Sequence, residues 1–222
     1  MKLAKYIDNT LLKPNATKLD IEKFARDSLP YDFATICILP GHIEYARDIL
    51  KGSDVKIATV IGFPLGLNST ETKVFETKDA IYRGAHEIDM VINISWGQDK
   101  EYDLIKEEIG KIYNAVKSLG NELLLKVIIE TCYLDKEGIK EICKACKDIG
   151  VDFVKTSTGF GTAGAQIEDI KLMKELLGEK PQIKASGGIR SYEDAKEFID
   201  AGAMRLGTSG GFNIVDKSKG YK

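Results

Sequence analysis

Short apolar runs rich in β-branched residues recur along the chain and predict buried strands. Successive residues within each run are apolar, which is typical of strands that are covered on both faces of a parallel sheet. Seven runs are clear, at residues 33–39, 56–61, 88–93, 123–129, 151–156, 182–185 and 204–207. Residues 7–12 supply an eighth expected strand.

Amphipathic, charge-rich segments separate these runs and predict helices. We expect helices over residues 17–29, 70–82, 102–119, 136–149, 167–177 and 192–201. Strand and helix together take roughly 24–36 residues, the length of one βα unit. Many helical segments are followed by a glycine, the residue expected at a left-handed C-terminal cap: Gly52, Gly84, Gly120, Gly150, Gly178 and Gly202.

Eight strand–helix units favour a closed (β/α)8 barrel, the TIM barrel, over an open doubly wound sheet. An open sheet would need only about five strands. No Ser/Pro-rich linker divides the 222 residues, so the predicted fold is one α/β barrel domain over residues 1–222 with a short N-terminal extension.

The composition is that of a soluble globular protein, with 43% hydrophobic and 30% charged residues and a net charge of −2. Charges of both signs are interspersed, which argues against a nucleic-acid partner or a membrane-surface patch. No apolar run approaches the roughly 18 residues of a membrane span. The N-terminus lacks the apolar stretch of a secretory signal, so we expect a cytoplasmic protein.

Four cysteines are present, and in a cytosolic chain they are expected to be reduced thiols. Cys143 and Cys146 form a CxxC within a helix-like segment, where they would share one face. The favoured interpretation is two buried core thiols. Redox or metal chemistry is the alternative, although no second CxxC or histidine pair completes a zinc site.

In barrels of this kind the site lies at the C-terminal ends of the strands. Four inward polar residues are expected there: Asp8, Asp89, Lys155 and Lys184. Lys155 follows Phe153 by two residues and so shares its face, and Lys184 occupies the matching place on the next strand.

Two lysines on adjacent strands, roughly 5 Å apart, would crowd two ammonium groups into one dry cavity. Burial and a like charge both lower a lysine pKa from its ordinary value of about 10.4. A neutral amine attacks a carbonyl to form a Schiff base, which makes Lys155 a candidate nucleophile. The alternative is that either lysine points outward or extends to water from the rim.

Asp89 requires a partner, because an unpaired buried charge is costly. With a protonated Lys184 it could pass protons during imine formation and C–C cleavage. A purely structural ion pair is the alternative. Lys126 and Glu130 share one parity on the fifth strand and are expected to extend the network.

Glycine-rich loops follow the seventh and eighth expected strands, as ASGGIR at residues 185–190 and GTSGG at residues 207–211. Barrels frequently bind phosphate with these two loops. Glycines let backbone N–H groups approach an anion, and helix N-termini add favourable dipole charge. Either loop alone could be a plain tight turn, but their joint position favours a phosphate site.

Histidines are scarce, since the chain contains only His42 and His86. Metal-dependent aldolases commonly use several histidine ligands. His86 precedes a strand, on the side opposite the expected site. We therefore expect no metal and no cofactor, with lysine as the nucleophile.

At these residues the sequence resembles the deoxyribose-phosphate aldolase family. The matching segments span nearly the whole chain: IDNTLLKP (7–14), GFPLG (62–66), EIDMVIN (87–93), KVIIET (126–131), VKTSTGF (154–160) and KASGGIR (184–190). The resemblance implies a class I aldolase that reversibly cleaves 2-deoxy-D-ribose 5-phosphate to D-glyceraldehyde 3-phosphate and acetaldehyde.

The same resemblance implies residue roles. Lys155 would form the imine, Lys184 would stay protonated and depress the Lys155 pKa, and Asp89 would exchange protons with Lys184. The resemblance also implies that the phosphate loops contain Gly159, Gly187, Gly188, Gly207 and Ser209, and that Asp8 and Cys37 are pocket residues near the substrate.

Two positions depart from the family pattern. Asn9 stands where the motif usually carries histidine, and we expect activity to survive because asparagine still donates a hydrogen bond. Phe160 stands where some members carry a phosphate-facing lysine, so that charge contact is missing. Some members use a C-terminal tyrosine, but no role is transferred to Tyr221, since terminal tails are usually mobile.

The expected partners are a small phosphosugar and aldehydes, together with further copies of the chain in a dimer or tetramer. Two alternative functions remain. A sugar-phosphate isomerase or epimerase would use the same loops with a Glu, Asp or His base. A non-catalytic phosphate-binding barrel would leave the buried charges without a role.

Overall fold

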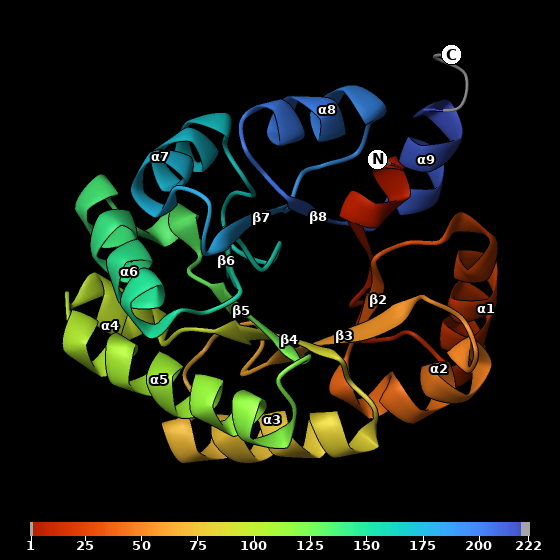
Figure 1. Cartoon of the computed structure of the whole chain (residues 1–222), viewed down its shortest axis with the longest axis horizontal. Helices are drawn as coiled ribbons and strands as arrows, with labels where there is room; N and C mark the ends of the chain where they lie inside the picture. The colour runs from red at the N-terminus through yellow and green to blue at the C-terminus, as the bar shows by residue number, and fades with distance from the viewer. Residues whose placement is uncertain (1, 219–222) are drawn as a thin grey trace.

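The strands close into a parallel barrel in sequence order, as the computed structural model, which describes residues 2–218, shows (Figure 1). This confirms the predicted (β/α)8 fold. Each strand lies within two residues of its expected bounds: β1 (Ile7–Leu11), β2 (Thr35–Ile38), β3 (Lys56–Ile61), β4 (Glu87–Val91), β5 (Leu124–Ile128), β6 (Phe153–Lys155), β7 (Gln182–Ser186) and β8 (Arg205–Thr208).

Helices form an outer ring around the barrel (Figure 1). They are α1 (Lys18–Ser28), α2 (Ile43–Leu50), α3 (Thr70–Arg83), α4 (Ile94–Gln98), α5 (Tyr102–Leu119), α6 (Lys136–Ile149), α7 (Ile167–Leu177), α8 (Tyr192–Asp200) and α9 (Gly211–Ser218). Within residues 2–218 no helix is both long enough and apolar enough to cross a membrane.

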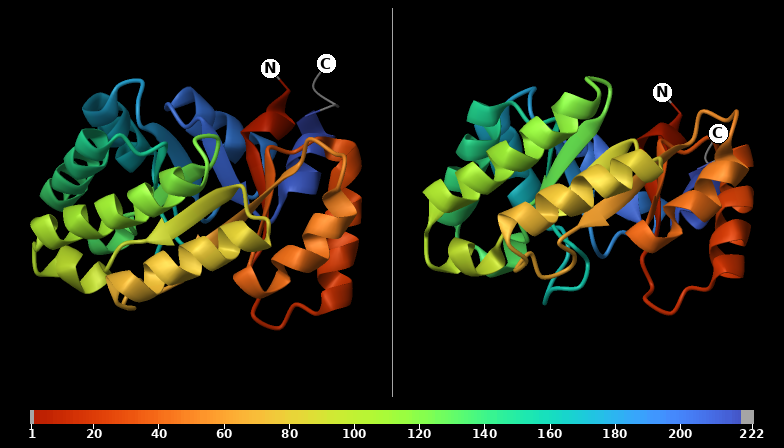
Figure 2. Two further views of the ribbon diagram at one scale, coloured as in Figure 1. Left: turned by 60° about the horizontal axis from the view of Figure 1, so that its bottom comes forward. Right: turned by 90° about the horizontal axis from the view of Figure 1, so that it is seen from below.

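The expected N-terminal extension is the single 3-10 turn η1 (Leu3–Tyr6), which packs beside α9 (Figure 2). Three further 3-10 turns occupy loops: η2 (Leu29–Tyr31), η3 (Pro40–His42) and η4 (Thr131–Tyr133).

Local capping chemistry sets several helix ends. Thr17 begins α1 with a capping box in which its side chain and that of Asp20 each accept a backbone N–H. The glycine cap prediction is confirmed at Gly84 and Gly150, which are both left-handed. It is wrong at Gly120, whose φ of 171° is extended backbone that any residue adopts.

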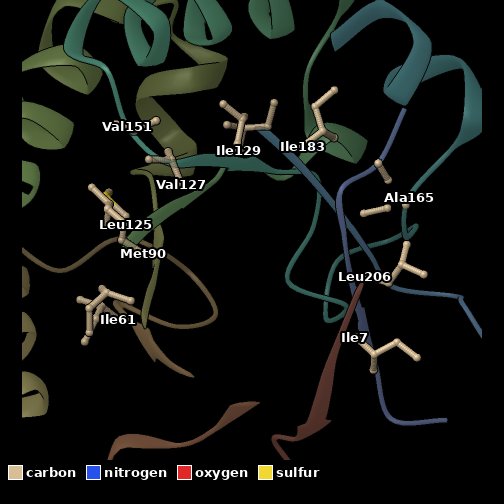
Figure 3. Close-up of a cluster of buried hydrophobic side chains, with 14 of the residues drawn as sticks. Ile7, Ile61, Met90, Leu125, Val127, Ile129, Val151, Ala165, Ile183 and Leu206 are labelled. Carbon is tan, nitrogen blue, oxygen red and sulfur yellow. The ribbon is translucent and has the colours of Figure 1, made fainter. Parts of the chain in front are cut away.

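The apolar core lies between the barrel and the helices. Alternate strand residues point outward and form one large buried cluster with the inner faces of the helices. Figure 3 shows part of it, with Ile7, Ile61, Met90, Leu125, Val127, Ile129, Val151, Ala165, Ile183 and Leu206 labelled. Because the outward-facing side chains of the strands supply the apolar core, the inward-facing side chains can be polar.

Cys143 and Cys146 lie in this core, buried on the inner face of α6 as free thiols. Burial raises the pKa of Cys143 to about 12. The prediction of core thiols is therefore confirmed.

The loop between β3 and α3 is held against the end of β4 at Gly66. Its φ is 69°, and its N–H donates to the Gly62 carbonyl at 2.7 Å. A Cβ added here would lie 1.8 Å from the Ile92 carbonyl oxygen. Gly66 therefore permits a backbone contact that no other residue allows.

We expect Gly66→Ala to lower the free energy of unfolding more than Gly150→Ala. Both positions have positive φ, but a Cβ at Gly150 meets nothing within 4 Å. Gly150→Ala should cost about 1–2 kcal/mol from backbone strain alone. Gly66→Ala should add roughly 1–3 kcal/mol of overpacking. Urea denaturation of the two variants measures the difference, and equal losses would contradict the close-contact explanation.

Candidate active site

The inward faces of β6, β7 and β8 bring three basic side chains side by side. The strand register pairs Lys155 with Lys184, and Lys184 with Arg205. Parallel neighbours in register point to the same face, so all three enter the lumen. The expected adjacency of Lys155 and Lys184 is present.

Asp89 joins three lysines at the centre of the lumen. Its Oδ2 accepts hydrogen bonds from Lys155 Nζ at 2.8 Å and from Lys184 Nζ at 2.7 Å. Its Oδ1 accepts from Lys126 Nζ at 2.8 Å. One carboxylate from β4 thus connects β5, β6 and β7, and Lys126 extends the network as expected.

Two further carboxylates lie deeper, toward the N-terminal ends of the strands. Asp8 contacts Lys184 and accepts from Arg205 Nη1 at 2.6 Å. Glu87 lies 2.6 Å from Lys126 Nζ and accepts from Arg205 Nη1 at 2.9 Å. Asp8 therefore lies beneath the reacting region and contacts it through Lys184.

Neither Arg205 nor Glu87 was predicted from the sequence. Both lie at the first position of a strand, where barrel residues usually contribute to stability rather than to the site. The alternation of side chains along a strand could have placed both residues in the lumen, because Glu87 precedes Asp89 by two residues and Arg205 precedes Gly207 by two.

The lumen network holds three carboxylates and four basic groups. The carboxylates are Asp8, Glu87 and Asp89, and the basic groups are Lys126, Lys155, Lys184 and Arg205. All are buried or nearly so, where net charge is costly. The network is electrically balanced when one basic group is neutral.

The pKa directions identify that group as Lys155. Burial lowers the pKa of Lys155; Asp89 opposes this effect and Lys184 adds to it. For Lys184, burial also lowers the pKa, but the carboxylates of Asp8 and Asp89 outweigh it and raise the pKa above its ordinary value.

Lys126 is likewise kept protonated, because three carboxylates raise its pKa against burial. The expected depression of the Lys155 pKa is thus present. Its largest cause is burial rather than the charge of Lys184.

The opposite side of the lumen is apolar. Cys37 and Ala58, register partners on β2 and β3, pack with Leu12 and Val60. Burial raises the pKa of Cys37 to about 11, so its thiol is protonated at neutral pH. Cys37 therefore provides a small apolar wall facing the charged side.

A pocket of about 300 Å³ opens above the network at the C-terminal ends of the strands. Of the lumen's charged side chains within residues 2–218, only Lys155 lines it. The pocket also contains all five predicted loop residues: Gly159, Gly187, Gly188, Gly207 and Ser209. Asp8 and Cys37 do not line it.

Hydrogen bonds of the Thr208 hydroxyl connect the two glycine loops at the pocket wall. Thr208 Oγ1 donates to the Ile189 carbonyl at 2.6 Å and accepts from the Gly210 N–H at 2.9 Å. At Gly207 a Cβ would lie 2.9 Å from Ser186 Cβ and 3.1 Å from Lys184 Cε. Glycine at 207 therefore lets Lys184 pass beneath the loop.

Two basic side chains that were not predicted, Lys13 and Arg190, also line the pocket. Lys13 follows β1 and Arg190 precedes α8, so they approach from different loops. Phe160 lines the pocket as well and makes an edge-to-face contact with Phe63, with ring centroids 5.2 Å apart.

Glu130 does not extend the ion network, contrary to the expectation from its parity with Lys126. Its carboxylate accepts from the Thr158 N–H at 3.2 Å and from the Thr158 hydroxyl. The cause is its left-handed backbone, with a φ of 51°, which ends the alternation of the strand. Glu130 instead holds the loop after β6.

Asn9 points away from the lumen. Its Nδ2 donates to Ser28 Oγ at 3.3 Å, and its Oδ1 lies against Gly211 at the start of α9. Asparagine here therefore packs β1 against two helices and makes no pocket contact. Tyr221 lies outside the described residues.

Comparison with known proteins agrees with this geometry. The family model of DeoC/LacD family aldolases matches residues 2–215. A deoxyribose-phosphate aldolase of Caldanaerobacter subterraneus subsp. tengcongensis is 54% identical over 99% of this chain and 94% of its own length. One of Clostridium tetani is 50% identical over 99% of this chain and 100% of its own length.

Solved structures give the same result. An aldolase designated QR15 superposes with a TM-score of 0.92 at 40% identity, covering 98% of this chain and 96% of its own. A tetrameric deoxyribose phosphate aldolase from Aeropyrum pernix superposes with a TM-score of 0.90 at 32% identity, covering 99% and 92%. The chain belongs to the DeoC/LacD family of aldolases.

Proposed function

We propose that this aldolase forms an imine at Lys155 and reversibly cleaves 2-deoxy-D-ribose 5-phosphate to D-glyceraldehyde 3-phosphate and acetaldehyde. The observation that carries the proposal is the position of Lys155. It is the lumen lysine with a lowered pKa, and it lines the pocket bounded by the two glycine loops.

Imine formation begins with attack of the neutral Lys155 amine on the substrate aldehyde carbon. Loss of water from the carbinolamine requires a proton at the departing hydroxyl. Asp89 does not hold that proton at rest, because its neighbouring lysines keep its pKa well below the ordinary value despite burial. The Lys184 ammonium, 2.7 Å from Asp89, is the resident acid, and Asp89 relays the proton.

Cleavage then breaks the bond between substrate carbons 2 and 3. The carbon 3 hydroxyl loses its proton and becomes the aldehyde of glyceraldehyde 3-phosphate. The bonding electrons move into the imine and leave a two-carbon enamine on Lys155. Protonation of the enamine and addition of water release acetaldehyde and restore the amine. The apolar side chain of Leu12, which lines the pocket and packs with Cys37 and Val60, suits this two-carbon fragment.

The phosphate is placed at the loops that contain Gly159, Gly187, Gly188, Gly207 and Ser209. Backbone N–H groups in such loops can approach an anion closely because no Cβ intervenes. The start of α9 at Gly211 adds helix-dipole charge to the same side. Lys13 and Arg190 supply cations there in place of a lysine at Phe160.

We also propose that the protein acts in the cytoplasm and assembles as a dimer or tetramer of identical chains. The four free cysteines suit a reducing compartment. Large exposed apolar side chains such as Phe75 and Tyr82 on α3 suit contact with another chain.

Reductive trapping tests the imine. Cyanoborohydride with acetaldehyde should add a two-carbon group to Lys155, located by mass spectrometry of peptides. Lys155→Leu should abolish the adduct and lower cleavage on the order of a thousandfold or more. Its fold should survive, because removing a neutral amine leaves three carboxylates with three cations.

Lys56→Leu, at the opposite end of the barrel from the pocket, is the control and should trap normally. An adduct on another lysine would overturn the assignment. Sugar-phosphate isomerisation retained in Lys155→Leu would support an isomerase instead.

The phosphate assignment predicts a substrate-dependent effect of Lys13→Gln and Arg190→Gln. Each should raise KM for 2-deoxyribose 5-phosphate roughly fivefold, the loss expected for about 1 kcal/mol of exposed ion pairing. KM for 2-deoxyribose, which lacks the phosphate, should not change. Lys56→Gln is the matched control. Equal changes with both sugars would place these side chains outside phosphate recognition.

A further inference from the structure

We propose that Arg205 and Glu87 are positioning residues that determine how many protons the lumen network holds, and so leave Lys155 as its one free amine. The proposal rests on the imine mechanism above. It extends that mechanism to two residues at the N-terminal end of the barrel that do not line the substrate pocket.

Arg205 provides the fixed positive charge of the network. Its guanidinium cannot give up its proton under ordinary conditions. Its Nη1 contacts Asp8 and Glu87, and its Cζ lies 5.2 Å from the centroid of the Phe153 ring. The side chain is only 11% exposed, so little water screens this charge from the groups above it.

Two of the three carboxylates, Asp8 and Glu87, contact Arg205. Asp8 also contacts Lys184 and lies 3.5 Å from Lys126 Nζ, and Glu87 also contacts Lys126. With Arg205 present, Lys126 and Lys184 complete the neutralisation of all three carboxylates. A fourth proton, on Lys155, would give the buried network a net positive charge.

Removing Arg205 changes this balance. Three carboxylates would then face three lysines, and neutrality would require every lysine, including Lys155, to be protonated. Removing the charge of Glu87 has the opposite effect, because it leaves two carboxylates with an excess of cations.

The titratable groups that share the lumen with Lys155 lie on β1, β2, β4, β5, β7 and β8. They are Asp8, Cys37, Glu87, Asp89, Lys126, Lys184 and Arg205, while β3 contributes only Ala58 and Val60. Cys37 is an uncharged thiol at neutral pH. The charges of the remaining six groups therefore decide the proton content. Arg205 and Glu87 are the two that contact neither Lys155, Lys184 nor Asp89.

The experiment measures the pH at which trapping of Lys155 with acetaldehyde and cyanoborohydride reaches half its maximum. Arg205→Met should raise this midpoint by about one pH unit, which lowers trapping about tenfold at pH values below the midpoint. Glu87→Gln, nearly isosteric, should lower the midpoint. Arg205→Lys keeps the charge and should stay near the unsubstituted protein.

The double variant Arg205→Met/Glu87→Gln provides the decisive control. It removes one charge of each sign, so its midpoint should return toward that of the unsubstituted protein even though two contacts are lost. A merely structural role would lower the amount of folded protein without producing opposite shifts that cancel.

Shifts of the same sign, or unchanged midpoints, would overturn the proposal. Should Arg205→Met fail to fold, Glu87→Gln decides alone: a lower midpoint supports the proposal and an unchanged one overturns it. An absence of trapping in the unsubstituted protein would instead overturn the imine mechanism, which separates the two failures.

Discussion

The Asp89 carboxylate, shared by three lysines, is the interaction on which the site depends. A charge buried this deeply is tolerated only with partners, and here they come from β5, β6 and β7. Lys126 is the register partner of Asp89, and Lys155 and Lys184 are paired with each other two residues further along the barrel. The barrel can carry such a lumen because its apolar core lies on the other face of the same strands. Strand alternation therefore separates the layer that stabilises the fold from the layer that performs chemistry.

Charge balance explains why one lysine becomes a nucleophile while its neighbours remain cations. Burial penalises every ammonium in the lumen, but Lys184 contacts two carboxylates and Lys155 contacts only Asp89. The difference in partners sets the difference in pKa direction between adjacent, register-paired lysines. Lys155 also reaches the pocket, so the least protonated amine is the one that substrate meets.

Much of the fold and the central lysine pair could be predicted from the sequence. Continuous apolar strands and amphipathic helices have distinct periods, and parity placed Lys155 and Lys184 on one face. Glu130 could not be placed, because its left-handed backbone ends the alternation on which parity depends. Arg205 and Glu87 lie at strand starts, and their importance appears only when the lumen charges are counted together.

The arrangement of the network also indicates which function requires these charges to be buried, despite the free-energy cost of burial. Replacing a buried ion network by well-packed apolar residues is often neutral or stabilising, so stability alone does not require seven ionisable side chains in the lumen. The apolar half around Cys37 and Val60 shows that the same barrel lumen also accommodates uncharged, apolar side chains. The charges are confined to the side that contains Lys155, where a deprotonated amine and a resident acid must coexist. That requirement is met because the basic groups outnumber the carboxylates by one, and because one of the cations, Arg205, never releases its proton.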